Sequence, residues 1–413
     1  MFLSRGDRDL GVAFQTHPER SSIMNPYGKY KTWAEIDVGA LRHNYRQIAS
    51  HIHKEAPDCR VIAAVKANAY GHGADIVAQT LMEEGCGFFA VSCLYEAVLL
   101  RETVGRDADI IILGYSLPED TEALVRQNII QTVFSPEYAA ALSREMARLK
   151  ASGILPHKAT LRTHVKIDTG MNRLGFDGAD GAAAARQIAE LIELPHLKVE
   201  GMFTHFATAD EDRDGEGLTA KQLARFEEVE AILKKQGICP PMLHCCNSAA
   251  ALHLPGAYKD GVRTGILLYG MSPDGSILPE YKPVLSLKTR IAHIHTLRAG
   301  ESVSYGATFT AKRDMRLATI PVGYADGFVR AFGGASVKLK DGRPAPVVGR
   351  ICMDQCMIDI GDADVKPGDA VTLFGGDDGT MIENLARLGD TINYEITCIL
   401  TPRVPRIPVH TER

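Results

Sequence analysis

The chain has 413 residues, which is more than one ordinary domain needs and fewer than three would fill. It is 45% hydrophobic and 23% charged, a composition typical of a globular enzyme. Its 46 Lys and Arg residues against 51 Asp and Glu residues give a net charge of −5, so no basic field indicates a nucleic-acid partner. No apolar run approaches the roughly 18 residues that a membrane-spanning helix requires.

The first part of the chain differs from the rest. Charged residues such as Asp7 and Asp9 have no apolar stretch behind them, which argues against both a secretory signal and a transit peptide. We interpret residues 1–32 as a disordered extension, within which Met24 is an alternative start.

The nine cysteines include no C-x-x-C pair. Cys245 and Cys246 have apolar neighbours, which is typical of buried, reduced thiols in a cytoplasmic protein. Cys352 and Cys356 would need further His or Cys ligands to hold zinc, and no metal site is predicted.

From residue 37, short apolar runs alternate with helical patterns. Val38, Leu41 and Tyr45 recur at helical spacing, and Val61–Val65 is an unbroken apolar run that suits a strand buried on both faces. Further strand-like runs follow at Phe88–Val91, Ile110–Leu113, Ile129–Val133, Leu161–Ile167, Leu197–Phe203, Met242–Cys246 and Val262–Leu268. Eight such βα units favour a closed parallel (β/α)8 barrel of the TIM type over residues 33–280, with an open α/β sheet as the alternative.

After about residue 280 the pattern becomes that of a mainly-β domain, which we assign to residues 281–413. Turn residues separate its strand-like segments, and helical periodicity survives mainly at Ile382–Leu388. These strand-like segments are Val284–Thr296, Arg316–Val322, Ala345–Met353 and Ala370–Phe374. We expect the two domains to be joined near Asp274–Lys282.

Lys66 follows the apolar run Val61–Val65 directly, in the segment AVKANAYGHG. A lysine at the end of a barrel strand lies at the C-terminal mouth, where barrel enzymes have their active sites. Because small and apolar neighbours reduce its solvation, the pKa of its ammonium group should fall, which makes the amine available for an imine. The alternative is a lysine that reaches solvent from a strand end.

Two further loops follow predicted strands. In KIDTGMNRLG, Lys166 ends a strand, and Arg173 is placed where its guanidinium could bind a carboxylate or phenolate. In THFA, His205 follows the sixth strand and should face the mouth. An ordinary surface arginine and a structural histidine are the alternatives for Arg173 and His205.

Asn247 and Ser248 follow the seventh strand and open a helix, and the segment that begins at Arg263 lies on and after the eighth strand. Barrel enzymes bind phosphate at the loops after these two strands, through amides at helix N-termini. Ser248 could cap the helix that it opens and donate to a phosphate, or act as a cap alone. An imine-forming lysine and a phosphate site at one mouth together suggest pyridoxal phosphate.

These segments resemble the alanine racemase family, pyridoxal-phosphate enzymes of fold type III. AVKANAYGHG, DTGMNRLG, THFATAD, NSAA and VRTGILLYG resemble the family's N-terminal domain, and VSYGATF, PVGYADG, VGRICMDQCMIDI and TINYE resemble its C-terminal domain. The matches run in order from about Trp33 to Pro405. Any one of them is weak, but together, at the family's spacing, they are specific.

The resemblance implies a cytoplasmic bacterial enzyme that interconverts L-alanine and D-alanine with pyridoxal 5'-phosphate and supplies D-alanine for peptidoglycan. It implies a head-to-tail homodimer with shared active sites, no nucleic-acid or membrane partner, and alanine as the small-molecule substrate. The implied catalytic residues are Lys66, which forms the imine, Tyr305, which acts in the partner subunit's site, and Arg263 and His205, which link the pyridine nitrogen towards that tyrosine. The implied cofactor-binding residues are Lys66, Tyr70, His205, Asn247, Ser248, Arg263, Gly265, Ile266 and Tyr394. Arg173, Met353 and Asp354 resemble substrate-binding residues, and Lys166 resembles a lysine that is carbamylated in some members.

The reaction explains these residue types. Removing a Cα proton and returning one to the opposite face needs two groups, Lys66 and Tyr305. A free tyrosine with a pKa of about 10 is only ~0.1% ionised at pH 7, a handicap of about 4 kcal/mol. Positive charge relayed from Arg263 through His205 would reduce this handicap. Arg263 cannot hand over its own proton, which should limit transamination.

Three alternatives stay open. A serine or broad-specificity amino-acid racemase is disfavoured by Tyr394, since alanine-specific members carry tyrosine there. A non-catalytic pyridoxal-phosphate-binding barrel is disfavoured by the presence of the β domain with Tyr305. The third alternative is a cofactor-free barrel aldolase that forms its imine at Lys66, and absorbance of the purified protein would distinguish it from a pyridoxal-phosphate enzyme. We interpret His293 and His295 as structural and leave Asp326 as either a turn residue or a functional one.

Overall fold

The computed structural model describes residues 30–212, 217–376 and 380–410. Most of the predicted extension, including Met24, lies outside these described residues. Residues 32–413 form one unit by their contacts, and this unit contains both a barrel and a β domain. Among the described helices, none has the length and apolar character needed to cross a bilayer.

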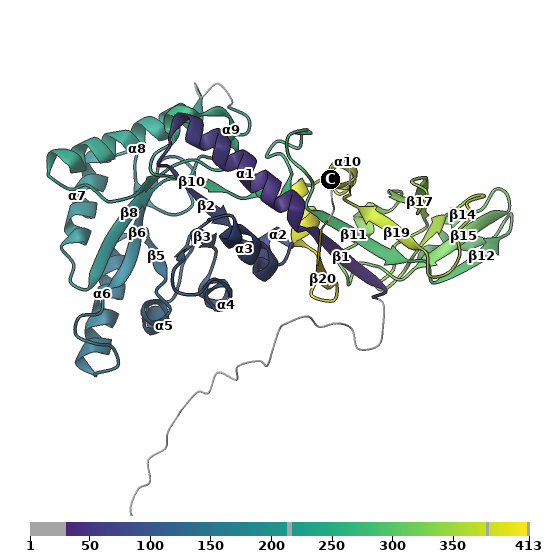
Figure 1. The fold of residues 1–413 in the computed structure, drawn as a ribbon, viewed down its shortest axis with the longest axis horizontal. Helices are drawn as coiled ribbons and strands as arrows, with labels where there is room; N and C mark the ends of the chain where they lie inside the picture. Colours follow the sequence, from purple (N-terminus) through teal and green to yellow (C-terminus); the bar gives the residue numbers. More distant parts are fainter. Residues whose placement is uncertain (1–29, 213–216, 377–379, 411–413) are drawn as a thin grey trace, which may run out of the picture. The chain divides into compact units, whose positions relative to one another are not determined.

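The first part of this unit is a barrel of parallel strands, as predicted (Figure 1). The described strands neighbour one another in the order β10-β2-β3-β4-β5-β6-β8-β9, and the short β7 (Phe176–Asp177) pairs with β6 outside this order. Backbone bonds also join the two ends of the order: Asp260 N–H donates to Leu243 O at 2.9 Å and Arg263 N–H to Cys246 O at 3.0 Å. The sheet is therefore nearly closed, and the open-sheet alternative was wrong. Its strands are β2 (Arg60–Ala64), β3 (Phe88–Val91), β4 (Asp109–Ile112), β5 (Ile130–Val133), β6 (Leu161–Asp168), β8 (Leu197–Phe203), β9 (Leu243–His244) and β10 (Gly261–Thr264).

Helices surround this barrel and bury apolar residues against it (Figure 1). Helix α1 shows the pattern most clearly: Val38, Leu41 and Tyr45 are buried, and the Asp37 carboxylate caps the helix by accepting from the N–H groups of Gly39 and Ala40. The barrel helices are α1 (Val38–Glu55), α3 (Ala74–Glu83), α4 (Leu94–Val104), α5 (Thr121–Arg126), α6 (Pro136–Ala151), α7 (Gly181–Ile192), α8 (Leu218–Lys235) and α9 (Ser248–His253).

The predicted strand Val262–Leu268 is two elements in the structure. Strand β10 ends at Thr264, and a 3-10 helix, η3, spans Ile266–Tyr269. Gly265 separates them, and its N–H donates to Ser248 Oγ at 2.9 Å instead of to a neighbouring strand. The chain therefore leaves the ladder at the mouth of the barrel, which is where the family resemblance placed cofactor-binding residues.

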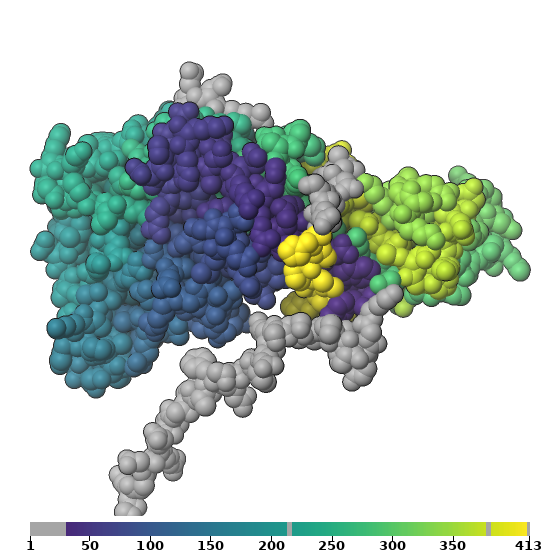
Figure 2. All heavy atoms as spheres, viewed as in Figure 1, coloured from purple at the N-terminus to yellow at the C-terminus, as the bar shows by residue number. Residues whose placement is uncertain are grey.

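The second sheet of the described chain has the order β12-β15-β18-β17-β16-β19-β11-β1-β20. Strand β1 (Thr32–Asp37) pairs antiparallel with β11 and parallel with β20, although it comes before the barrel in the sequence. Figure 2 shows the yellow C-terminal residues packed against this purple strand. The predicted domain boundary at residue 280 assigns β1 to the barrel, whereas β1 pairs with strands of the second sheet. The boundary itself stays a prediction. The strands that follow the barrel are β11 (Leu285–Arg290), β12 (His293–Leu297), β15 (Met315–Ile320), β16 (Ser336–Lys338), β17 (Pro344–Val348), β18 (Cys356–Asp359), β19 (Ala370–Phe374) and β20 (Arg406–Val409).

Smaller elements complete the β domain. A hairpin of β13 (Ser302–Val303) and β14 (Phe309–Thr310) encloses the 3-10 turn η4 (Tyr305–Ala307), and helices α10 (Thr380–Leu388) and α11 (Asn393–Cys398) follow β19. Helix α11 packs against the turn after Lys66 so closely that a Cβ on Gly71 would lie 2.0 Å from the Thr397 carbonyl oxygen. The β domain thus reaches the mouth of the barrel.

Candidate active site

Lys66 opens a short turn, α2 (Lys66–Tyr70), directly after β2. The next four residues, Ala67 to Tyr70, have φ values of 52–55°, which is the left-handed region. This conformation costs a non-glycine residue roughly 1–2 kcal/mol. The turn therefore stores backbone strain immediately beside a partly buried lysine, as functional sites commonly do.

The environment of the Lys66 amine favours its neutral form. Burial lowers its pKa, and the positive charge of Arg173 lowers it further. Nζ lies 5.9 Å from the centroid of the Tyr70 ring, and no hydrogen bond or ion pair joins it to another described residue. The amine is thus available to react with a carbonyl group, as the sequence predicted.

Arg263 lies on β10 with only 4% of its surface exposed. Its Nη1 donates to Nδ1 and to the carbonyl of His244, at 2.6 and 2.8 Å. Its Nη2 donates to the carbonyls of Thr204 and Cys245, at 2.7 and 2.8 Å. Burial lowers the pKa of Arg263 to about 10, so it still carries its charge at neutral pH. These bonds fix the guanidinium plane and, among the described residues, leave Nε without an acceptor.

His205 follows β8, and its side chain contacts Arg263 directly, as that of His244 does. The Arg263 Nη2 to His205 Nδ1 distance is 3.4 Å. Burial, followed by the charges of Arg263 and Arg173, holds the pKa of His205 well below its ordinary value. The imidazole is therefore neutral near pH 7, and Nδ1 accepts from the arginine.

The loops after the seventh and eighth strands meet at Gly265 and Ser248. The side chain of Asn247 caps α9 by accepting from Ala250 N–H at 3.0 Å, so the predicted capping role of Ser248 was wrong. Ser248 Oγ instead accepts from Gly265 N–H. Ile266 opens η3, and the first N–H groups of a helical turn have no partner within that turn.

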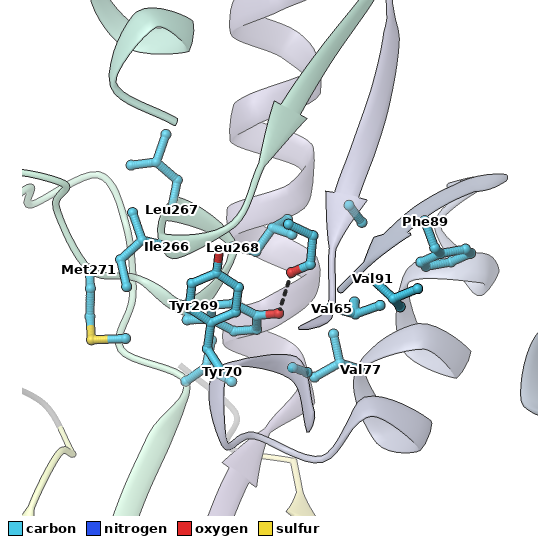
Figure 3. Close-up of a cluster of buried hydrophobic side chains, with 14 of the residues drawn as sticks. Val65, Tyr70, Val77, Phe89, Val91, Ile266, Leu267, Leu268, Tyr269 and Met271 are labelled. Atoms are coloured by element: carbon cyan, nitrogen blue, oxygen red, sulfur yellow. Dashed lines mark hydrogen bonds between the residues drawn. The ribbon is translucent and has the colours of Figure 1, made fainter. Parts of the chain in front are cut away.

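Tyr70 closes this loop region from the side of Lys66. A Cβ on Gly265 would lie 2.5 Å from Tyr70 Oη, so only glycine leaves the space open. The Tyr70 ring packs between those of Tyr269 and Tyr394, with centroid distances of 5.1 and 5.9 Å. Figure 3 shows Tyr70 lying on Tyr269, whose hydroxyl donates to the Ala64 carbonyl at 2.9 Å. Tyr70 therefore has little freedom to move.

Arg173 and Lys166 lie on the loop after β6. The carboxylate of Asp168 organises this loop: Oδ1 accepts from Gly170 and Asn172 N–H, each at 3.0 Å, and Oδ2 from Arg173 N–H at 2.8 Å. Lys166 Nζ donates to the carbonyl of Leu174. Burial lowers the pKa of Lys166 to about 8.

Tyr305, Met353 and Asp354 lie on the β domain. Tyr305 is 73% exposed and Met353 53% exposed. The Met353 segment is held by Tyr324 and Ala325, whose N–H groups donate to the carbonyls of Cys352 and Met353 at 3.1 and 3.0 Å. The Ser304 hydroxyl donates to the Arg350 carbonyl and also contacts Cys352 Sγ at 3.5 Å, which keeps the Tyr305 turn beside this segment. No hydrogen bond or ring contact among the described residues joins these side chains to Lys66 or Arg263.

The comparisons with known proteins cover both domains. Residues 36–273 match the family model "Alanine racemase, N-terminal domain", and residues 284–408 match "Alanine racemase, C-terminal domain". The chain is 44% identical over 380 residues to alanine racemase of Desulfovibrio desulfuricans, covering 91% of this chain and 98% of the relative. It is 42% identical over 391 residues to that of Geobacillus stearothermophilus, covering 93% and 95%. The chain belongs to the alanine racemase family.

Solved structures agree with this assignment. Alanine racemase of Clostridium difficile 630 superposes with a TM-score of 0.83 at 37% identity, covering 93% of this chain and 97% of that one. Alanine racemase of Bacillus anthracis with bound L-Ala-P gives 0.82 at 35% identity, covering 94% and 97%. As an alanine racemase, the chain is an enzyme of the isomerase class.

Sequence reasoning missed several residues around this alanine racemase site. His244 was hidden inside an apolar run, and it joins Arg263 to His164, with 2.9 Å between His244 Nε2 and His164 Nδ1. Asp168 was quoted within a motif but given no role, although an aspartate two residues before a glycine is a recognisable loop-organising signal. Asp326 proves to be a turn residue, because its buried carboxylate accepts from Gly323 N–H at 3.0 Å.

Proposed function

We propose that this alanine racemase interconverts L-alanine and D-alanine with pyridoxal 5'-phosphate held at the barrel mouth. The proposal rests on one observation. The Lys66 amine, whose pKa is lowered, lies within the electrostatic influence of a buried arginine, Arg263, whose guanidinium is oriented by hydrogen bonds. The family assignment supports the same reaction.

The residues at the mouth fit this cofactor. Lys66, Tyr70, His205, Asn247, Ser248, Arg263, Gly265, Ile266 and Tyr394 would hold it. The Nε of Arg263 has no acceptor among the described residues and suits a pyridine nitrogen. The position that a Cβ on Gly265 would take lies beside the Tyr70 hydroxyl and the first N–H groups of η3. Hydroxyl and N–H donors of this kind suit a phosphate.

When bound, pyridoxal phosphate withdraws electron density from the substrate Cα and so makes its proton acidic. Arg263 would donate a hydrogen bond to the cofactor ring and keep its proton, because its pKa of about 10 leaves it charged at neutral pH. His205 is held neutral and lies 3.4 Å from Nη2 of Arg263.

Two side chains of the protein move the proton. Lys66 takes or returns it on one face of Cα, since its lowered pKa favours the neutral amine that can accept a proton. The phenol of Tyr305 from a second copy does so on the other face. Arg173 and the backbone N–H of Met353 bind the substrate carboxylate, with Asp354 held beside them by Arg403 at 2.8 Å.

A head-to-tail homodimer is therefore part of the proposal. Tyr305 and Met353 are exposed, adjacent and without contact to the mouth of their own barrel among the described residues. Exposed aromatic and Met side chains are typical of protein interfaces. A second copy would supply both of them to this mouth, and each subunit would complete the site of the other.

The proposal also covers cellular role. All nine cysteines, which lie in the described part of the chain, are free thiols, as expected for a protein of the reducing cytoplasm. There the enzyme supplies D-alanine for peptidoglycan.

Borohydride reduction of the purified holoenzyme followed by peptide mapping tests the cofactor attachment. We expect a phosphopyridoxyl label on Lys66, its loss in Lys66→Ala, and no change in the matched variant Lys158→Ala, because Lys158 is exposed. The wild-type enzyme should form D-alanine from L-alanine much faster than it racemises L-serine. A label on another lysine, bound cofactor without racemisation, or equal rates with serine would contradict the proposal.

A further inference from the structure

Glu96 connects the Lys66 turn to the next strand of the barrel. It lies in the first turn of α4, and its Oε1 accepts from the backbone N–H of Ala67 at 2.6 Å. Its Oε2 accepts from the backbone N–H of Ser92, directly after β3, at 2.8 Å. Hydrogen bonds from N–H groups to a carboxylate are about twice as strong as those between neutral groups.

The bonded N–H groups are significant because of where they lie. Ala67 is both the neighbour of Lys66 and the first left-handed residue, with φ of 52°. This N–H lies in the peptide plane between Lys66 and Ala67, so its bond to Glu96 fixes that plane where the left-handed run begins. The carboxylate therefore stabilises the left-handed turn at the residue where it begins.

Other bonds hold the far end of the turn. Asn68 Oδ1 accepts from Ala74 N–H at 2.9 Å, and the Asn68 carbonyl accepts from Gly73 N–H at 3.0 Å. At the beginning, Ala67 N–H has Glu96 as its partner. Within the turn, Ala69 N–H donates to the Val65 carbonyl at 2.8 Å and Gly71 N–H to the Ala67 carbonyl at 2.9 Å. Removing Glu96 thus leaves the Ala67 N–H, next to the lysine, without this partner, while the rest of the turn stays bonded.

We propose that Glu96 is a positioning residue, which orients the Lys66 amine by bridging the first left-handed residue to the end of β3. The inference rests on the proposed function of Lys66. It concerns one side chain that contacts neither the proposed cofactor site nor the substrate. Its hydrogen bond acts through the backbone: it fixes the peptide plane between Lys66 and Ala67, and that plane fixes the direction in which the Lys66 side chain leaves the chain. The negative charge of Glu96 also raises the pKa of Lys66, and Glu96→Gln, which removes the charge but keeps an acceptor oxygen, separates the two effects.

The test compares Glu96→Ala, Glu96→Gln and Glu102→Ala in the holoenzyme. Glu102 is an exposed glutamate of the same helix and provides the matched control. For Glu96→Ala we expect kcat to fall about tenfold to hundredfold, the cost of roughly 1 Å of misplacement, with a much smaller change in KM for alanine. Glutamine keeps one acceptor oxygen, so Glu96→Gln should fall between wild type and Glu96→Ala.

Hydrogen–deuterium exchange gives a readout independent of activity. Peptides spanning residues 66–73 should exchange faster in Glu96→Ala, as should the peptide that contains Ser92, whose N–H loses the same partner. The remaining barrel peptides and all peptides of Glu102→Ala should be unchanged. A kcat equal to that of Glu102→Ala, unchanged exchange at 66–73, or faster exchange throughout the barrel in Glu96→Gln would overturn the inference. Borohydride labelling of wild type away from Lys66 would instead overturn the proposed function, and the exchange result would still decide the role of Glu96 in the turn.

Discussion

Nη2 of Arg263 lies 3.4 Å from Nδ1 of His205 at the mouth of the barrel. The arginine is charged and the histidine is neutral, because burial and the arginine together hold the pKa of His205 well below its ordinary value. A neutral imidazole that accepts from a guanidinium is polarised by it, and it has a second ring nitrogen with which to pass this polarisation on. This pair has the charge state and the contact that the proposed charge relay would require.

Arg263→Glu should change the products. A carboxyl group can share a proton with a pyridine nitrogen, whereas the guanidinium cannot give its proton up. We expect racemisation to slow and the pyruvate formed per D-alanine to rise by about tenfold or more, a typical size for a proton-transfer effect. Pyruvate coupled to a dehydrogenase assay measures this ratio. Arg263→Lys, which keeps the charge but loses the fork, should slow the enzyme without raising the ratio, and an unchanged ratio in Arg263→Glu would count against the account.

Tyr305→Phe should reduce exchange of the Cα proton with solvent unequally for the two enantiomers. Loss of one of two acid/base groups costs about 100-fold to 10,000-fold in the steps that use it. Tyr95→Phe is the matched control, since Tyr95 is 71% exposed on the barrel. Small, equal losses with L-alanine and D-alanine would remove Tyr305 from the mechanism.

The same variants test whether two subunits share a site. Lys66→Ala and Tyr305→Phe are each nearly inactive alone if the proposal holds. Dissociated and reassociated as an equal mixture, they should recover about a quarter of the wild-type sites, because half of the dimers are mixed and each of these has one intact site. No recovery in a mixture shown to contain mixed dimers would mean that each site is built within one chain.

Gly265→Ala should weaken cofactor binding. The added Cβ would lie 2.5 Å from Tyr70 Oη, and the Tyr70 ring, packed between Tyr269 and Tyr394, cannot move away. We expect the Kd for pyridoxal phosphate to rise at least about tenfold, which corresponds to roughly 1.4 kcal/mol. Titration of the cofactor-free protein by absorbance measures it. Gly256→Ala, at a position with nothing within 4 Å of the new Cβ, should bind normally.

Asp168→Asn should loosen the loop that carries Arg173. Burial raises the pKa of Asp168, but hydrogen bonds from the N–H groups of Asn172, Gly170 and Arg173 outweigh it, and the pKa ends below its ordinary value. Replacing the partly exposed carboxylate should cost about 1–2 kcal/mol of unfolding free energy and raise KM for alanine.

The pH dependence of this cost has a definite sign. Because the folded state lowers the pKa of Asp168, its contribution is complete above the unfolded value of about 3.9 and is lost as pH falls through the lower folded value. Denaturant unfolding of wild type and Asp168→Asn should therefore differ most near neutral pH and converge in acid. Asp107→Asn, at an exposed residue, should match wild type throughout. A difference that does not depend on pH would exclude this carboxylate effect.

The barrel could be predicted because its signal is local. Each strand is a short apolar run bounded by polar residues, and residues that follow such runs lie at the mouth, which located Lys66, His205 and Arg263 without reference to other proteins. The pairing of β1 with β11 and β20 could not be predicted in this way, because it joins segments from opposite parts of the chain. Helix α11 has six residues, too few for a helical period to be visible.

Details of the site needed the coordinates for different reasons. The left-handed run from Ala67 to Tyr70 contains no glycine, so its residue types do not predict its backbone conformation. Ser248 opens a helix and has a cap's chemistry, but Asn247 before it takes that position. The residues of the proposed second half, Tyr305 and Met353, are ordinary exposed side chains until another copy of the chain is considered.

Strand β1 lies between β11 and β20 in the sheet of the β domain, although the whole barrel separates it from both along the chain. During synthesis it leaves the ribosome before the barrel, and it has no edge to join until β11 has followed and no second neighbour until β20 has followed. The barrel strands and helices, whose neighbours are close in sequence, can assemble on the nascent polypeptide in the meantime. Closure of this sheet is consequently a late step of folding, and a ribosome-bound fragment ending before Arg406 should carry a formed barrel beside an unfinished sheet.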